Sequence, residues 1–358
     1  MQMIDGVRPG ALSCAVGRAG RAEGNPRAVA AWLLVCCALV FAMVVVGGVT
    51  RLTHSGLSIT EWAPIVGTLP PLSEADWAEA FSRYRATPEF RQVNPDMDLG
   101  GFKRIFWWEY AHRLLGRAIG VAFLAPYLWF LVRRRIPRGY AAALGAIFAL
   151  GGLQGALGWY MVQSGLIDDP RVSHLRLTAH LGLAFLIFGA MLWVGLSLLR
   201  PPPANTGSPG LRRLAGRLAA LVFLMVLAGG LVAGIRAGFA YNTFPLMNGH
   251  WVPPEILMLE PWYRNFTNNM ATVQFDHRLL AAILALLVPW FVWRVHRTAD
   301  LPAPARRAAE LFLALLAVQI ALGIATLLLV VPLALAAAHQ AGALMLFAAA
   351  LNARHTLR

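Results

Sequence analysis

The chain has 358 residues, of which 58% are hydrophobic and only 13% are charged. In soluble globular domains about a quarter of all residues are charged, so this composition excludes a soluble enzyme and predicts a protein with several membrane-spanning helices. The net charge of +14 does not indicate nucleic acid binding, because the arginines lie mostly between the apolar runs, as they do in the cytoplasmic loops of membrane proteins.

Residues 1–27 are rich in Arg, Gly and Ala and precede the first apolar run. We interpret them as a cytoplasmic tail. The alternative is a mitochondrial presequence, since the segment carries arginines and few acids. Cys14 lies in this tail, and Cys36 and Cys37 are adjacent within the first apolar run, so neither a structural disulfide nor a zinc site is predicted.

Eight apolar runs follow, each of roughly the 20 residues that a bilayer requires. They begin near Ala28, Ile105, Tyr140, Ser173, Leu214, Asn268, Ala308 and Leu333. Arginine clusters follow the second, fourth, sixth and eighth runs, which places these loops and both termini in the cytoplasm. The predicted fold is therefore an all-α membrane protein with eight transmembrane helices.

Two long loops are expected on the outer side, at about 51–104 and 237–267. Both contain Pro, Trp and acidic residues, and we expect short surface helices in them. Ser73, followed by Asp76 and Trp77, has the pattern of a helix start with an acid in its first turn.

The two halves of the chain resemble each other. Residues 45–64 resemble 227–245, 109–116 resemble 274–281, 153–158 resemble 318–323, and 178–185 resemble 337–344. We therefore predict two pseudo-symmetric four-helix bundles, at 28–199 and 214–352, with a cytoplasmic linker at 200–213 and a cytoplasmic tail at 353–358. Because four spans return the chain to the same side, the halves share one orientation, with a pseudo-two-fold axis along the membrane normal.

This repeat pairs His112 with His277, and His180 with His339. Each lies a few residues into its span from the outer face, at a depth of about 10 Å. Two inward-facing histidines from different helices can provide both axial ligands of a haem iron, so the repeat predicts two haem sites side by side near the outer leaflet. A single histidine in an apolar helix is more often structural, and it is the repetition that favours ligation.

Zinc or copper is the weaker alternative, because few cysteines or acids accompany the histidine pairs. The other five histidines are in loops, at a helix start or on the cytoplasmic side, and we predict that they are not ligands: His54, His174, His250, His296 and His355.

Three arginines are candidates to bind the haem propionates by bidentate hydrogen bonds. Arg113 and Arg278 directly follow a repeat histidine, and Arg117 lies one turn deeper. The alternative for the first two is that they reach outward to lipid phosphate.

Glu109 lies three residues before His112, and helical spacing puts both on one face. The second half has Gln274 at this position. An acid in only one half indicates chemistry in the first half and electron transfer in the second. The alternative is a structural glutamate near the start of the helix.

These residues resemble those of the haem A synthases, in the class found in alphaproteobacteria and mitochondria. The matching segments are 47–71, 102–117 with the element EYAHR, 151–166, 175–184, 275–278 and 338–340. Some bacterial members carry a cysteine pair in the outer loops, which this sequence lacks.

The resemblance implies an oxidoreductase of the bacterial inner membrane, with its haem sites near the periplasmic side. It implies that His112 and His180 hold the substrate haem O, that His277 and His339 bind a haem B cofactor, and that Glu109 is the catalytic glutamate. The reaction is oxidation of the C8 methyl group of haem O to a formyl group through a hydroxymethyl intermediate, which yields haem A for cytochrome oxidase assembly.

The expected partners are haem O, membrane lipid, haem O synthase and cytochrome oxidase assembly factors, together with an electron-transfer partner that the sequence does not identify. Nucleic acid is not expected. The first alternative is a dihaem b-type electron-transfer protein, although such carriers usually place their haems at opposite leaflets. The second is a transporter, which would need charged or broken helices near the midplane.

Overall fold

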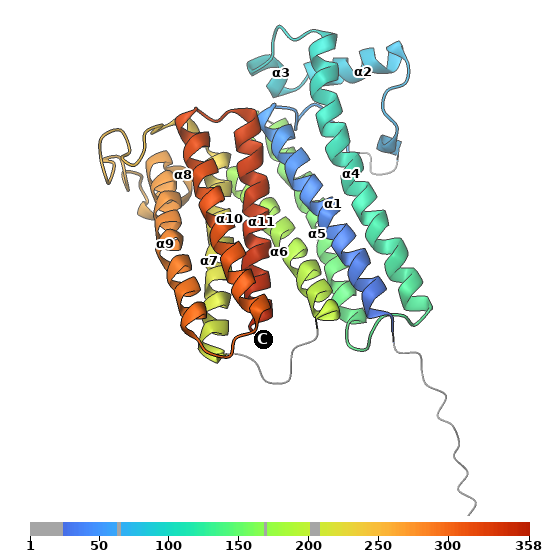
Figure 1. Cartoon of the computed structure of the whole chain (residues 1–358). Helices are drawn as coiled ribbons and strands as arrows, with labels where there is room; N and C mark the ends of the chain where they lie inside the picture. Colours follow the sequence, from blue (N-terminus) through green and yellow to red (C-terminus); the bar gives the residue numbers. More distant parts are fainter. Residues whose placement is uncertain (1–23, 63–65, 168–169, 201–207) are drawn as a thin grey trace, which may run out of the picture.

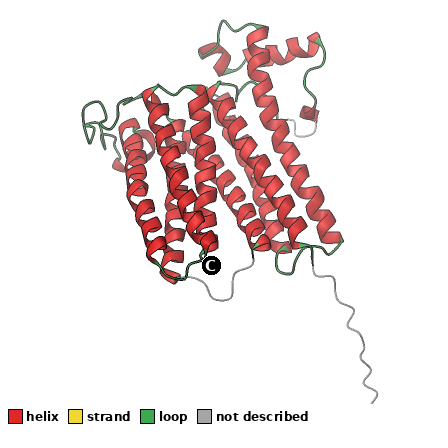
Figure 2. Cartoon of the chain, in the orientation of Figure 1, coloured by secondary structure: helices red, strands yellow, loops and turns green. Residues whose placement is uncertain are grey.

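The computed structural model describes residues 24–62, 66–167, 170–200 and 208–358. Most of the predicted N-terminal tail, including Cys14, and much of the predicted linker fall outside these ranges. The described part of the chain is helical and contains no strand, only an isolated bridge between Met247 and His250 (Figure 2). The prediction of an all-α protein is confirmed.

Eight helices in the described ranges are long and apolar enough to cross a membrane, as predicted. They are α1 (Pro26–Leu52), α4 (Leu99–Val132), α5 (Ala141–Leu166), α6 (His174–Leu199), α7 (Pro209–Gly234), α9 (Met270–Arg297), α10 (Ala303–Leu328) and α11 (Leu333–Thr356). Helix α4 begins earlier than the predicted Ile105, because the carboxylate of Asp98 accepts a hydrogen bond from the amide of Gly101 (2.7 Å) and so caps a longer helix.

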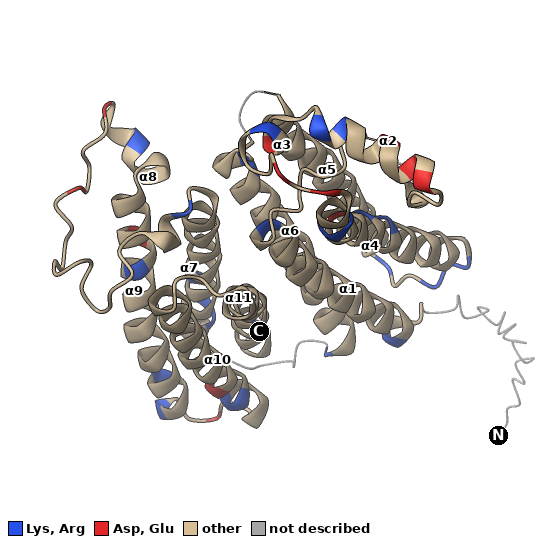
Figure 3. Ribbon diagram, turned by 90° about the horizontal axis from the view of Figure 1, so that it is seen from above, with Lys and Arg blue, Asp and Glu red and all other residues tan. Residues whose placement is uncertain are grey.

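The spanning helices form two groups of four, with α1, α4, α5 and α6 beside α7, α9, α10 and α11 (Figures 1 and 3). Helices α1 and α6 of the first group contact α7 and α11 of the second. The start of α1 and the end of α11 lie at the same end of the bundle (Figure 1). Both groups share one large apolar core, which runs through the contact between them.

Two short helices, α2 (Glu74–Arg85) and α3 (Pro88–Gln92), form an outer cap beside the projecting start of α4 (Figure 1). The side chain of Ser73 accepts from the amide of Asp76, and Asp76 accepts from the amide of Ser73, so the predicted helix start is a capping box. These hydrogen bonds lower the pKa of the Asp76 carboxyl group. A separate aromatic core holds the cap together: Trp77, Tyr84, Phe102 and Phe106.

The other long outer loop, between α7 and α9, carries the helical turns η2 (Ala237–Phe239) and η3 (Trp262–Arg264) and the one-turn helix α8 (Asn265–Asn268). The prediction of short helices in both outer loops is therefore confirmed, and η1 (Val66–Thr68) adds a further turn to the first loop. Asn265 is fully buried and donates to the carbonyls of Leu259 and Trp262 (both 2.8 Å), which fixes the end of the second loop.

Polar contacts join the two halves at their outer end. The Arg51 guanidinium on α1 donates to the carbonyls of Ala233 and Gly234 at the end of α7. Below it, the Gln340 amide on α11 donates to the carbonyl of Val44 (3.0 Å). Each contact joins a side chain of one half to a backbone carbonyl of the other, so the two groups of helices are tied together.

Candidate functional site

The four repeat histidines lie in four different helices, and each faces a glycine of a neighbouring helix. The His112 ring on α4 lies so close to Gly47 of α1 that a Cβ there would be 2.8 Å from its Cε1, and the His277 ring stands in the same relation to Gly229 (3.2 Å). The absence of a side chain at these glycines creates the room in which the rings sit.

The second histidine of each half also lies against a glycine of a neighbouring helix. A Cβ on Gly158 of α5 would lie 2.9 Å from Cε1 of His180, and a Cβ on Gly323 of α10 would lie 2.9 Å from Cε1 of His339. Each half therefore directs one histidine from its second spanning helix and one from its fourth into the space between helices.

Two glutamines hold the backbone beside these rings. The Gln154 amide donates to the carbonyl of His180 (3.0 Å) and lies 3.3 Å from its Nε2. The Gln319 amide donates to the carbonyl of His339 (2.9 Å). Sequence analysis missed both residues, although the repeated segments LQGALG and VQIALG contain them at the same position.

The residues present fit a haem iron in each half. The Nδ1 atoms of His112, His180, His277 and His339 are buried, and none has a hydrogen-bond partner among the described residues. A buried polar nitrogen without a partner is costly unless something else satisfies it. A haem needs axial ligands for its iron and space for a large planar ring. Imidazoles from two helices can provide the ligands, and the neighbouring glycines leave the space.

Other metal arrangements find less support. Among the described residues, no group of three or more His, Cys, Asp or Glu side chains is placed to hold a metal ion. Cys36 and Cys37 are buried free thiols in α1. Three of the five histidines outside the repeat have other contacts, namely His54 with Arg236, His296 with Glu310 and His355 with Ser197.

Glu109 is buried beneath the first outer loop, and both of its oxygens are engaged. Oε1 accepts from Nε and Nη2 of Arg113 (3.0 and 2.6 Å), while Oε2 accepts from the Ser58 hydroxyl and the amide of Ile59 (2.7 and 2.8 Å). The side chain is only 3% exposed. All of these neighbours donate, so both oxygens of the side chain act as hydrogen-bond acceptors.

Arg113 ties the same loop down. Its Nη2 donates to the carbonyl of Ile59 (2.7 Å) and its Nη1 to the carbonyl of Glu61 (2.9 Å). Because Nε and Nη2 also bind Glu109, this edge of the guanidinium is not free for the bidentate propionate contact that the sequence suggested. Arg117 lies one turn further along α4 and is partly buried.

The second half has the corresponding network without the acid. Nη2 of Arg278 donates to Gln274 Oε1 (2.8 Å) and to the carbonyl of Tyr241 (2.7 Å), and its Nη1 donates to the carbonyl of Thr243 (2.9 Å). The Gln274 amide donates to the carbonyls of Ala237 and Ala240 (2.7 and 2.9 Å). Position 109 or 274 therefore fastens the outer loop in both halves, and only the first half places a negative charge there.

A second acid that sequence analysis missed lies in the cap. Glu89 of α3 is 3% exposed, and its Oε2 is buried without a hydrogen-bond partner in the described part of the chain. Burial, and secondly the charge of Glu109, raise the pKa of Glu89 to about 8. The pattern of the loop gives no sign of this, because only the folded cap removes Glu89 from water.

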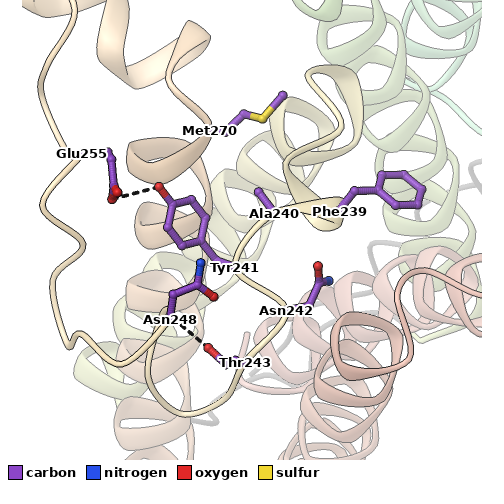
Figure 4. Close-up of a pocket in the computed structure, with 8 residues that line it drawn as sticks. All are labelled: Phe239, Ala240, Tyr241, Asn242, Thr243, Asn248, Glu255 and Met270. Atoms are coloured by element: carbon purple, nitrogen blue, oxygen red, sulfur yellow. Dashed lines mark hydrogen bonds between the residues drawn. The ribbon is translucent and has the colours of Figure 1, made fainter.

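A surface hollow lies elsewhere, at the outer loop of the second half (Figure 4). At the edge of this hollow, the Tyr241 hydroxyl donates to the carboxylate of Glu255 (3.0 Å), and the backbone amide of Asn248 donates to the Thr243 hydroxyl (2.7 Å). It contains none of the residues that the sequence singled out, and it is not the predicted haem site.

Comparisons with known proteins show the family to which the chain belongs. Residues 30–351 match the COX15-CtaA family model, which describes a cytochrome oxidase assembly protein. The chain is 64% identical to the "Heme A synthase" of Nitrosospira multiformis over 333 residues, which cover 92% of this chain and 93% of that protein. It is 56% identical to the "Heme A synthase" of Nitrosomonas eutropha over 331 residues, 91% and 93% of the two chains. It is 46% identical to that of Paracoccus denitrificans over 343 residues, 94% and 89%.

Proposed function

The chain belongs to the family of cytochrome oxidase assembly proteins, and from this premise we propose that it is a haem A synthase, a multi-pass membrane oxidoreductase that converts haem O to haem A. Relatives that carry this name share 46–64% of its residues over nearly its whole length. The observation that carries the proposal is the duplicated pair of histidines with buried, unpartnered Nδ1 atoms.

We assign the substrate to the first half and a cofactor to the second. His112 and His180 would hold haem O, and His277 and His339 would hold haem B. Haem B supplies one-electron transfer when bound. The argument for this division is the carboxylate of Glu109, which only the first half has beside its histidines.

Glu109 would act on the methyl group that is oxidised. Oxidation of the methyl group to the hydroxymethyl level would release two protons and pass two electrons to the electron-transfer partner, and a buried carboxylate would stabilise the positive charge that develops on the carbon. The same oxygens can take up the proton that water loses when it attacks the carbon. The salt bridge with Arg113 (2.6 Å) would hold the Glu109 carboxyl group in position for either role.

We propose that the arginines serve the haem propionates mainly through the loops. Arg113 and Arg278 hold the backbone of residues 59–61 and 241–243 over the outer ends of the two sites. A propionate would meet the remaining N–H groups of these arginines, and Arg117 would add positive charge one turn deeper.

The protein would reside in the bacterial inner membrane with both termini in the cytoplasm. The arginine clusters between α4 and α5 and between α9 and α10 support this, since they lie at the end of the bundle where α1 begins and α11 ends (Figure 1). The histidines would then lie near the periplasmic side. Haem O synthase and cytochrome oxidase assembly factors are the expected partners, with an electron-transfer partner still to be identified.

The test is haem extraction and chromatography on the purified protein. Haem B together with haem O, haem A or the hydroxymethyl intermediate supports the synthase. Two equivalents of haem B, unchanged when haem O is supplied, would instead favour the dihaem electron carrier. In the same assay, His277→Ala should lose haem B and keep the haem of the first half.

A further inference from the structure

The inner face of α5 opens at two glycines. Gly151 and Gly155 precede Gly158 by seven and three residues, so helix periodicity puts all three on one face. Gly158 marks this face as the one that meets His180. Gly151 and Gly155 are nevertheless exposed, and a Cβ on either would meet no atom within 4 Å.

This opening is not the lipid-facing side of the helix. Deeper on the same face, Leu144 is fully buried and Ile147 is 5% exposed, so the face is directed into the bundle. Leu153, on the opposite face, is 54% exposed, and its repeat counterpart Val318 is also 54% exposed. The lipid faces of α5 and α10 thus match, whereas their inner faces differ.

The second half fills the corresponding space. The alignment of LQGALG with VQIALG pairs Gly151 with Leu316 and Gly155 with Ile320. Leu316 is 3% exposed and belongs to the main core, and Ile320 packs against that core. The glycine beside the histidine, Gly158 or Gly323, is kept in both halves. Both halves therefore leave room for a ring at the histidines, but only the first leaves room beyond it.

Helix packing shows the same asymmetry. Helix α4 contacts α5 less extensively than α9 contacts α10. The stacked rings of Phe123 and Phe148, with centroids 6.1 Å apart, close the gap between α4 and α5 further from the outer face. The space beside Gly151 and Gly155 thus lies along α5 between this aromatic pair and Gly158, the glycine that faces His180.

We propose that the space beside Gly151 and Gly155 receives the isoprenoid tail of haem O, and that Leu316 and Ile320 exclude such a tail from the second half. This inference rests on the proposed function and assigns the substrate specificity of its two sites. Haem O differs from haem B by a long apolar substituent, so a site for haem O needs apolar volume next to the ring. Added side chains would occupy that volume, because the surrounding core is closely packed and yields little.

The experiment exchanges these residues between the halves. Gly151→Leu with Gly155→Ile gives the first half the side chains of the second. The purified variant should contain about tenfold less haem O and haem A than the wild type, while its haem B content is unchanged. The matched control is Ala156→Ile, which adds similar bulk on the lipid-facing side of α5 and should keep the wild-type haem composition.

The reciprocal variant, Leu316→Gly with Ile320→Gly, should let the second half take up haem O when haem O is supplied in excess. Retained haem B in the first variant shows that the protein has folded. Unaltered haem O content there, or loss of haem O in the Ala156→Ile control as well, would overturn the inference. If the wild type itself contains only haem B, the proposed function fails instead, so the two failures are distinguishable.

Discussion

At the residue scale, position 109 and its counterpart 274 share the task of fastening an outer loop, and position 109 is proposed to take part in chemistry as well. Both side chains lie beneath an outer loop, and both accept a hydrogen bond from an arginine four residues later. Glu109 and Gln274 differ in charge and in the direction of their remaining hydrogen bonds, because Glu109 accepts from the loop whereas Gln274 donates to it. The structural task alone does not require an acid.

Glu109→Gln separates the two roles. If the carboxylate takes part in chemistry, this variant should form haem A at least about a hundredfold more slowly, as expected when one positioned acid–base group is lost. Its haem content should stay within the range of the wild type. Haem A formed at the normal rate, measured by extraction at timed intervals, would show that residue 109 only fastens the loop.

Glu89 gives the outer cap a dependence on pH. Its pKa is about 8 in the folded cap against an ordinary 4.5, so the folded state holds an extra proton between these values. The stability of the cap is therefore greatest at low pH and falls as the pH rises through this window. Amide hydrogen exchange in α2 and α3, corrected for intrinsic rates, should be faster at pH 8.5 than at pH 5.5. Glu89→Gln should abolish the difference, and an unchanged slope in that variant would exclude Glu89 as its source.

At the element scale, each histidine depends on a neighbouring helix that offers a glycine. The spanning helices cross closely where α1 meets α4, and where α5 meets α6, and the ring then occupies the position of the missing side chain. Small residues at helix contacts are common in membranes because they allow close approach. Here the close approach is between a backbone and an imidazole, which fixes the direction of the ring.

A methyl group at these glycines should displace the ring. In Gly158→Ala the new Cβ would lie 2.9 Å from Cε1 of His180, so His180 must move, and the haem content of the first half should fall by more than half while haem B is retained. Gly323→Ala should have the opposite effect, with loss of haem B alone. Gly152→Ala is the control, since a Cβ there meets no atom within 4 Å. Equal haem contents in all three variants would argue against this role of the glycines.

At the scale of the whole molecule, the two halves behave as one body because their apolar core is continuous and their backbones exchange polar contacts. Arg51 is the clearest case, since it binds two terminal carbonyls of a helix in the other half. Carbonyls at the end of a helix have no partner within that helix. The Arg51 guanidinium adds hydrogen bonds from the neighbouring half to this helix end, where Ala233 also accepts from the amide of Arg236.

Removal of this contact should weaken the protein as a whole. Arg51→Leu should lower the free energy of unfolding by about 1–3 kcal/mol, because the hydrogen bonds from a charged donor to the other half are lost. The midpoint of thermal unfolding in detergent measures the effect. Arg83→Ala, which removes an exposed ion pair of the cap with Glu61 and Glu79, should change it far less, by about 0–1 kcal/mol. Equal shifts in both variants would contradict a special role for Arg51.

Sequence by itself determined the eight spans and the helix start at Ser73, and it singled out the four repeat histidines as candidate ligands. These features are local, since apolar length, helical spacing and matched positions in a repeat can all be read along the chain. The repeat also paired Glu109 with Gln274, although it did not show that both residues fasten a loop.

Tertiary structure alone decided what surrounds each of these residues. Only in the folded protein do Arg113 and Arg278 bind loop carbonyls. Glu89 is buried there. Gly151 and Gly155 face open space, whereas Leu316 and Ile320 are packed. The physical reason is that burial, hydrogen-bond satisfaction and free volume depend on segments far apart in the chain. No periodicity within one helix records how closely the next helix approaches it.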